Sequence, residues 1–146
     1  MLNRRVASLS LLAALCGCAS SVPRDPVYVG AAERRVDAGT VVFYRTNSIY
    51  GAGLRPDIRL DGQYVGHSAT GSMFRALVAP GKHRVSIDPT GPGGGSGTSF
   101  DVNVGPLATV YVRTWVGGLA WVGNLSYEQV DAAEAREHIK SLTAAN

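Results

Sequence analysis

Short apolar runs separated by turn-forming residues fill the chain after Gly39. Val, Ile, Tyr and Phe recur in these runs, and Gly, Pro and Asp stand between them, which is typical of an antiparallel β domain. The clearest alternation places Phe100, Val102 and Val104 on one face of a strand and polar residues on the other. We expect about seven or eight strands from this spacing. The pattern bounds seven of them, at residues 40–46, 57–60, 63–67, 72–79, 82–88, 98–104 and 108–115.

Two of the breaks between these runs carry specific turn chemistry. Asp61-Gly62 is a two-residue pair that tolerates positive φ, and it predicts a hairpin between residues 57–60 and 63–67. Pro80-Gly81 combines a fixed φ with a glycine, which is typical of a tight turn. We expect this turn to join residues 72–79 and 82–88 as a second hairpin.

The end of the chain has the pattern of one short amphipathic helix. Asp131-Ala-Ala-Glu134 resembles a capping box, and Lys140 stands in the last turn, where the helix dipole favours a cation. Apolar residues recur at helical spacing at Ala132, Ala135, Ile139 and Leu142. The expected fold class is therefore mainly β, a small antiparallel β-sandwich with one C-terminal α-helix.

Residues 1–17 have the composition of a secretory signal peptide. Arg4 and Arg5 precede an apolar run at residues 6–15, and small residues follow before a cleavage point. An apolar run of about ten residues is shorter than the roughly twenty that a membrane-spanning helix needs. We therefore expect export and removal of this segment.

The signal ends on Leu15-Cys16-Gly17-Cys18, which resembles the bacterial lipobox. The resemblance implies cleavage after Gly17 and a diacylglycerol on the sulfur of Cys18, and no other cofactor is expected. Cys16 stands where Ala or Ser is more usual. The competing interpretation is a Cys-x-Cys metal or redox pair, but Cys16 would leave with the signal and no other cysteine remains. The same resemblance implies that Ala19, and not Asp, after the lipidated cysteine directs the chain to the outer membrane, where we expect it on the periplasmic face.

The sequence predicts a flexible lipidated tether at residues 18–38 and one domain at residues 39–146. Pro23, Pro26 and mixed charges without a period characterise the tether. Removal of the signal leaves twelve basic and eleven acidic residues, and the net charge falls from +3 to +1. The remaining charges are scattered, which argues against a nucleic-acid partner.

The order of these signals resembles the bacterial lipoproteins that carry a DUF2846 domain. The resemblance covers residues 39–143 and rests on Val42-Phe43-Tyr44-Arg45, the segment from Ile58 to Gly66, Gly71-Ser72-Met73-Phe74, the segment from Ala79 to His83, Tyr111-Val112-Arg113 and Val130-Asp131. This chain departs from the family at Arg45-Thr46, where a proline commonly follows the arginine, and by a glycine-rich insertion at residues 91–97. The family has no assigned activity, so the resemblance implies location and architecture and supplies no catalytic residue.

Candidate chemistry elsewhere in the sequence is sparse. The glycine-rich stretch lacks the Gly-Lys-Ser/Thr of a phosphate-binding loop and predicts a flexible hairpin loop. His67, His83 and His138 fall on separate elements, which does not favour a metal site, and Glu134 with His138 predicts a surface pair. Since Ser96 lies in the flexible loop and no nucleophile elbow is present, no catalytic residue is assigned.

The segment from Trp115 to Trp121 is the most distinctive remaining feature. Its tryptophans are either core residues or, together with Leu119 and the loop at Tyr50, an exposed aromatic binding surface. We expect a non-enzymatic envelope lipoprotein that binds an envelope protein or glycan through this surface or a sheet edge, or that has an accessory structural role. The alternative is a small envelope hydrolase or another small-molecule enzyme, which would need a pocket that joins His67 or His83 to a serine and an aspartate.

Overall fold

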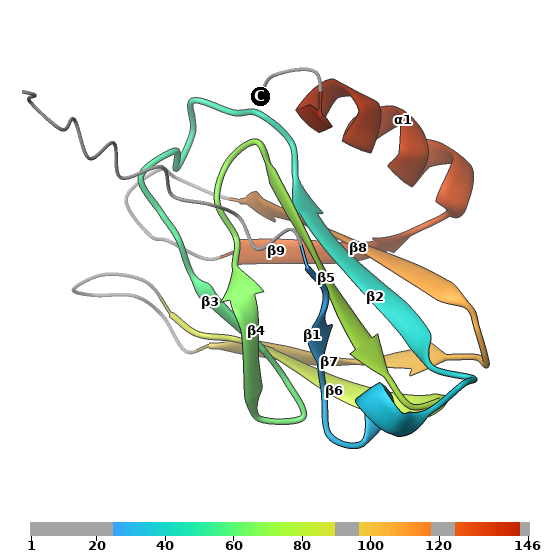
Figure 1. Ribbon diagram of the computed structural model, residues 1–146. Helices are drawn as coiled ribbons and strands as arrows, with labels where there is room; N and C mark the ends of the chain where they lie inside the picture. Colours follow the sequence, from blue (N-terminus) through green and yellow to red (C-terminus); the bar gives the residue numbers. More distant parts are fainter. Residues whose placement is uncertain (1–24, 90–96, 118–124, 144–146) are drawn as a thin grey trace, which may run out of the picture.

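The computed structural model describes residues 25–89, 97–117 and 125–143. These residues form nine strands in two facing sheets, with one α-helix packed outside them (Figure 1). The expected mainly-β sandwich with a C-terminal helix is confirmed. The elements are β1 (Val27–Tyr28), the 3-10 helix η1 (Ala32–Arg34), β2 (Gly39–Arg45), β3 (Asp57–Leu60), β4 (Gln63–His67), β5 (Ser72–Val78), β6 (Gly81–Ile87), β7 (Thr98–Val104), β8 (Thr109–Val116), β9 (Leu125–Val130) and α1 (Ala132–Thr143).

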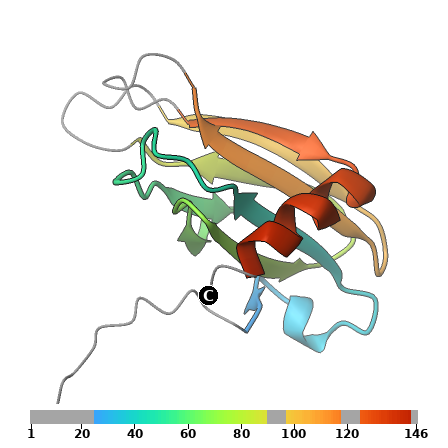
Figure 2. The ribbon, with the colours of Figure 1, turned by 90° about the horizontal axis from the view of Figure 1, so that it is seen from above.

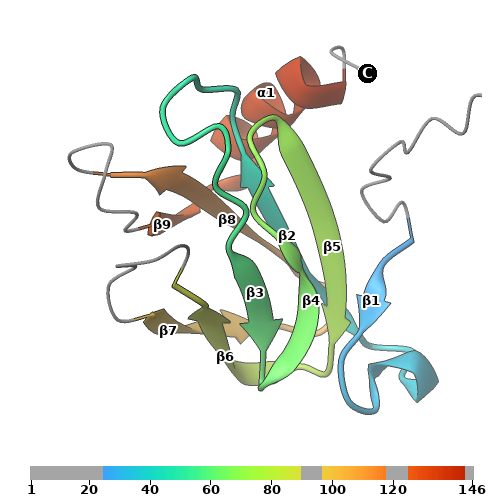
Figure 3. The same cartoon turned by 90° about the vertical axis from the view of Figure 1, so that its left-hand side faces the viewer.

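The strands of the two sheets are mixed along the sequence. One has the strand order β1-β5-β2-β8-β9 and the other β4-β3-β6-β7, and Figure 3 shows β6 and β7 of the second sheet apart from β8 and β9 of the first. Most neighbours are antiparallel, but β2 with β8 and β1 with β5 are parallel. β2 and β8 are neighbours in space but not in sequence, because β3 to β7 come between them along the chain.

Side chains on the facing surfaces of the two sheets make the main core. Val41 and Phe43 of β2 point inward, and the ring of Phe43 stacks on Phe74 with centroids 5.2 Å apart. Ile58 and Leu60 of β3 meet them from the other sheet and are fully buried. Each such side chain stabilises the fold by about 1.5–3 kcal/mol.

The two predicted hairpins have different outcomes. β3 and β4 pair across Asp61-Gly62, whose φ angles of 51° and 81° are those of the expected turn, so this hairpin is confirmed. The prediction of a hairpin across Pro80-Gly81 was wrong. β5 pairs with β1 and β2, whereas β6 pairs with β3 and β7. The turn reverses the chain as expected, but it carries the chain from one sheet to the other, so that both strands can bury an apolar face.

The predicted tether was wrong for the part of it that the structure describes. Val27 and Tyr28 extend the five-stranded sheet beside β5, and Val29 and Ala32 are buried. The side chain of Gln63 fixes this segment, since its Nε2 donates to the Tyr28 carbonyl at 2.8 Å and its Oε1 accepts from the Gly30 amide at 3.3 Å. The folded domain thus begins before residue 39, and residues 18–24 lie outside the described part.

The helix α1 forms as predicted and covers part of the outer face of the five-stranded sheet (Figure 2). Asp131 caps it, because its Oδ1 accepts from the amides of Ala133 at 2.8 Å and Glu134 at 3.0 Å. Ala135 and Leu142 bury against Tyr44. Among the described helices none is long and apolar enough to span a bilayer.

Candidate functional site

Arg45 is buried at the end of β2, at one open end of the sandwich. Alternation along β2 points Val41, Phe43 and Arg45 into the space between the sheets, and only 1% of Arg45 is exposed. Arg45 occupies the last inward position of β2, directly before the polar loop that follows this strand. Sequence reasoning listed Arg45 only within a family motif and gave it no role. The alternation of inward and outward positions along β2 was the signal that would have identified Arg45.

The guanidinium of Arg45 is held by backbone carbonyls. Nη2 donates to the Gly51 oxygen at 2.8 Å and to the Tyr50 oxygen at 3.2 Å, and Nη1 donates to Leu54 at 3.2 Å and Ser68 at 3.4 Å. Nε is buried and has no hydrogen-bond partner in the described part of the chain. These bonds gather the loop after β2 and the first residue after β4 around the charged group.

Within the described residues, no carboxylate pairs with the positive charge of Arg45. None of the ion pairs found there includes it. Burial lowers the pKa of Arg45, because the charged form loses its hydration, but an arginine remains protonated in proteins. A buried cation satisfied only by dipoles favours a negative charge nearby.

A pocket of about 490 Å³ opens beside this group. Its described lining is Arg45, Thr46, Asn47, Ser48, Tyr50, Trp115 and Val116. Tyr50 is 67% exposed at the rim, and Trp115 is partly buried with the guanidinium of Arg113 5.5 Å from its ring centroid. The pocket thus combines aromatic walls, polar side chains and a buried cation, which suits a small anionic or carbonyl-bearing group with a flat apolar part.

The loop that closes this pocket depends on a glycine. Gly51 has φ of 65°, and a Cβ there would lie 2.5 Å from Cγ2 of Val116 and 3.2 Å from Nη2 of Arg45. Ser48 orders the same loop, because its amide donates to Thr70 Oγ1 at 2.9 Å and its Oγ accepts from the Tyr50 amide at 3.1 Å. The rim is therefore built by local backbone bonds as well as by Arg45.

Two of the four residues predicted for a binding surface meet at this pocket. Tyr50 and Trp115 both line it, although they are 65 positions apart in the sequence. Leu119 and Trp121 lie outside the described residues. The lipobox residues Leu15, Cys16, Gly17 and Cys18 also lie outside them, as do residues 91–96 of the glycine-rich stretch.

In the described part of the chain, neither His67 nor His83 has a serine hydroxyl as a hydrogen-bond partner. His83 lies between Asp61 and a backbone carbonyl, with Nδ1 2.6 Å from Asp61 Oδ2 and Nε2 2.6 Å from the Ala79 oxygen. This arrangement ties the turn after β3 to the turn after β5 and uses both ring nitrogens. His67 Nδ1 is 3.4 Å from the Tyr64 hydroxyl.

The predicted surface pair of Glu134 and His138 is replaced by contacts to the sheet. His138 Nδ1 lies 3.0 Å from the Tyr44 hydroxyl, and Glu134 Oε1 lies 3.6 Å from Arg113 Nη1. Both groups face the strands instead of one another. Within the described ranges no three His, Cys, Asp or Glu side chains gather in a way that could hold a metal ion.

Comparison with known proteins gives no relative from which a role could be carried over. No protein-family model matches the chain, and no curated protein or solved structure is significantly similar to it.

Proposed function

We propose that this chain is a bacterial envelope lipoprotein whose sandwich is a non-enzymatic binding module for a partner that bears an anionic group. The N-terminal signal features and the lipobox-like Leu15-Cys16-Gly17-Cys18 support a diacylglycerol anchor on Cys18 at the periplasmic face of the outer membrane. The order of strand, turn and helix motifs supports membership of the DUF2846 lipoproteins.

One observation carries the binding part of this proposal. The guanidinium of Arg45 is buried beside an open pocket and has carbonyl partners but no carboxylate partner in the described chain. A carboxylate in the pocket would gain the attraction of this charge in surroundings of low dielectric constant. Tyr50 and Trp115 add flat apolar walls, so an acidic side chain of an envelope protein or an acidic sugar of a glycan fits the site.

Photocrosslinking in living cells tests the binding face. A benzophenone amino acid at Tyr50 stands on the rim of the pocket, and the same probe at Tyr64, which is 46% exposed on β4, is the matched control. We expect position 50 to give one dominant protein or glycan adduct that position 64 does not give. Identical adducts from both positions, or only abundant porins, would contradict a specific site.

Fatty-acid labelling tests the anchor separately. The wild-type chain should incorporate labelled palmitate, and Cys18→Ser should abolish the incorporation. Persistent labelling of Cys18→Ser would refute lipidation at this cysteine, whatever the crosslinking experiment gives.

A further inference from the structure

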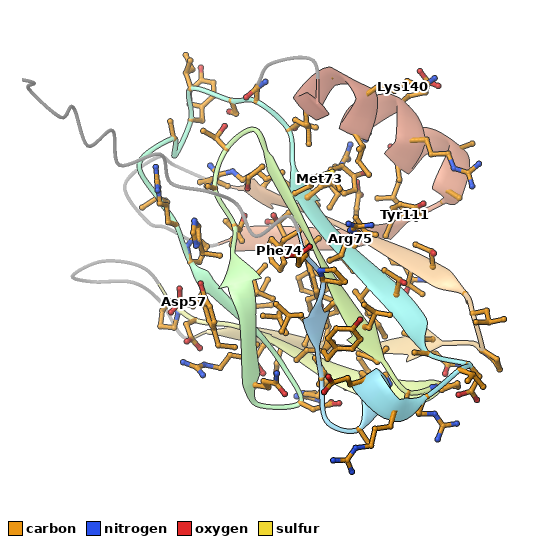
Figure 4. All side chains as sticks on the ribbon, viewed as in Figure 1. Asp57, Met73, Phe74, Arg75, Tyr111 and Lys140 are labelled. Atoms are coloured by element: carbon orange, nitrogen blue, oxygen red, sulfur yellow. The ribbon has the colours of Figure 1, made fainter. Side chains whose placement is uncertain are left out.

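A second concave surface lies between α1 and the outer face of the five-stranded sheet. We define the α1 groove by its described lining residues, which are Val42, Met73, Arg75, Tyr111, Arg136, Ile139 and Lys140, and its volume is about 360 Å³. Figure 4 shows Met73, Arg75 and Tyr111 on the strands beside α1, with Lys140 on the helix. This groove shares no lining residue with the pocket at Arg45.

The floor of the α1 groove is apolar. Met73, Tyr111 and Ile139 are partly buried side chains that pack around Tyr44, and Val42 lies beside them with 4% of its surface exposed. Apart from the Tyr111 hydroxyl and the weakly accepting sulfur of Met73, no described lining side chain can accept a hydrogen bond from a backbone N–H. A polypeptide backbone lying in the groove would therefore leave polar groups unsatisfied, whereas an acyl chain would not.

The rim of the α1 groove is cationic. Arg75, Arg136 and Lys140 surround the floor, and no acidic residue is among the described lining. Lys140 pairs with Glu137 at 2.7 Å, and both side chains are more than two-thirds exposed, so solvent screens this pair. The apolar floor with its cationic rim is complementary to one chain with a negative end.

The apolar surface here is recessed and does not protrude. The exposed large apolar residues of the described chain are Tyr28, Val36, Ile49, Tyr50, Tyr64 and Leu107, and none of them lies on α1 or in the groove. A face that inserts into a bilayer presents protruding apolar side chains. A recessed floor instead admits a single chain that has left the bilayer.

From the recessed floor and the charge of the rim we infer that the α1 groove binds one acyl chain of an anionic envelope lipid, whose headgroup contacts Arg75, Arg136 and Lys140. This inference uses the proposed envelope location but not the pocket at Arg45.

A photoreactive analogue that is nearly isosteric with methionine can probe the groove at Met73. Met1 and Met73 are its two methionines, so a diazirine analogue of methionine supplied to cells places a photoreactive group in the groove without any substitution. After irradiation, the adduct is read by mass spectrometry on the tryptic peptide of residues 60–75. The N-terminal peptide of the same sample reports whether Cys18 is lipidated, so failure of the anchor is distinguished from failure of the groove.

The matched control moves the probe to an exposed site. The double variant Met73→Leu, Leu107→Met places the analogue at a position that is 74% exposed, and retained protease resistance shows that each variant is folded. We expect an acyl-lipid adduct at position 73 that is about fivefold above that at position 107, and about fivefold weaker in Arg136→Glu. Arg34→Glu, a change at an exposed residue of η1, should leave the adduct unchanged.

Four results would overturn the inference. Equal lipid adducts at positions 73 and 107 would indicate general bilayer contact, and an adduct only with polypeptide would indicate a protein partner. A lipid adduct that is insensitive to Arg136→Glu would contradict the role of the rim charge. The absence of any adduct at Met73 in a lipidated, folded chain would leave the groove without its proposed occupant.

Discussion

Replacement of Arg45 by methionine removes the group that holds the loop of the pocket. The bond to Gly51 at 2.8 Å is a charged-donor bond worth about 1.5–3 kcal/mol, and the three bonds of 3.2–3.4 Å contribute about 0.5–1 kcal/mol each. The dehydration cost of the buried charge opposes this gain and disappears in the variant. We expect a net loss of about 2–3 kcal/mol in the free energy of unfolding.

Urea unfolding of the chain from Ala19 onward, followed by tryptophan fluorescence, measures this loss. Trp115 lines the same pocket, so its emission should also shift in the folded variant as the loop loosens. Arg55→Met is the matched control, because Arg55 is an exposed arginine in the same loop and should change stability by less than about 0.5 kcal/mol. An Arg45→Met variant as stable as the wild type would refute the reasoning, since the carbonyl contacts would then contribute no net stability.

Three further predictions use the same unfolding assay. Gly66→Ala should cost about 1–3 kcal/mol, because Gly66 has φ of 155° and its new Cβ would lie 2.8 Å from Cδ2 of Phe74, whereas Gly53→Ala, with open space around it, should be nearly neutral. Asp131→Ala should cost about 1 kcal/mol through loss of the helix cap, and Asp131→Ser should restore most of it. Hydrogen bonds from Lys82, and then Arg84, lower the pKa of Asp101, so its contribution to stability is present above the unfolded carboxyl pKa of about 3.9 and is lost as the pH falls through the folded value. The wild type should therefore exceed Asp101→Asn in stability at pH 6, and the two should converge once the pH has fallen below the folded pKa of Asp101. A constant difference would show that the carboxylate charge is not responsible.

Local signals predicted the elements of the fold better than their partners. Alternation such as that of Phe100, Val102 and Val104 located strands because one face must be buried, and Asp61-Gly62 specified its hairpin because both residues needed positive φ. Pro80-Gly81 specified a reversal but could not specify whether the two strands would pair or enter opposite sheets. That choice depends on which layer buries each apolar face, a property of the assembled sandwich.

The segments that the sequence did not predict form through distant contacts. Val27 and Tyr28 are too few to show a period, and they become a strand because β5 offers an edge and Gln63 supplies hydrogen bonds. β9 was not predicted either, and it forms by pairing with β8 along its length.

The sequence predicted the aromatic residues of the candidate site but not its buried arginine. Tyr50 and Trp115 were selected as unusual aromatics near glycines, and the structure brings both to one pocket. Arg45 was missed because a charged residue at the end of an apolar strand is expected to turn toward water. Its burial depends on carbonyls of residues 50, 51, 54 and 68, which only the folded loop brings together.

The most direct test of the central claim is an NMR titration of the pocket with benzoate and with benzamide, an uncharged molecule of nearly the same shape. The resonances to follow are the Arg45 Nε–H, the amides of Asn47 and Ser48, and the Trp115 indole. We predict saturable shifts of these signals with benzoate and much smaller shifts with benzamide, because the buried guanidinium of Arg45 attracts the carboxylate. Equal shifts with both probes, or no saturable shift with benzoate, would contradict an anion-binding site at Arg45.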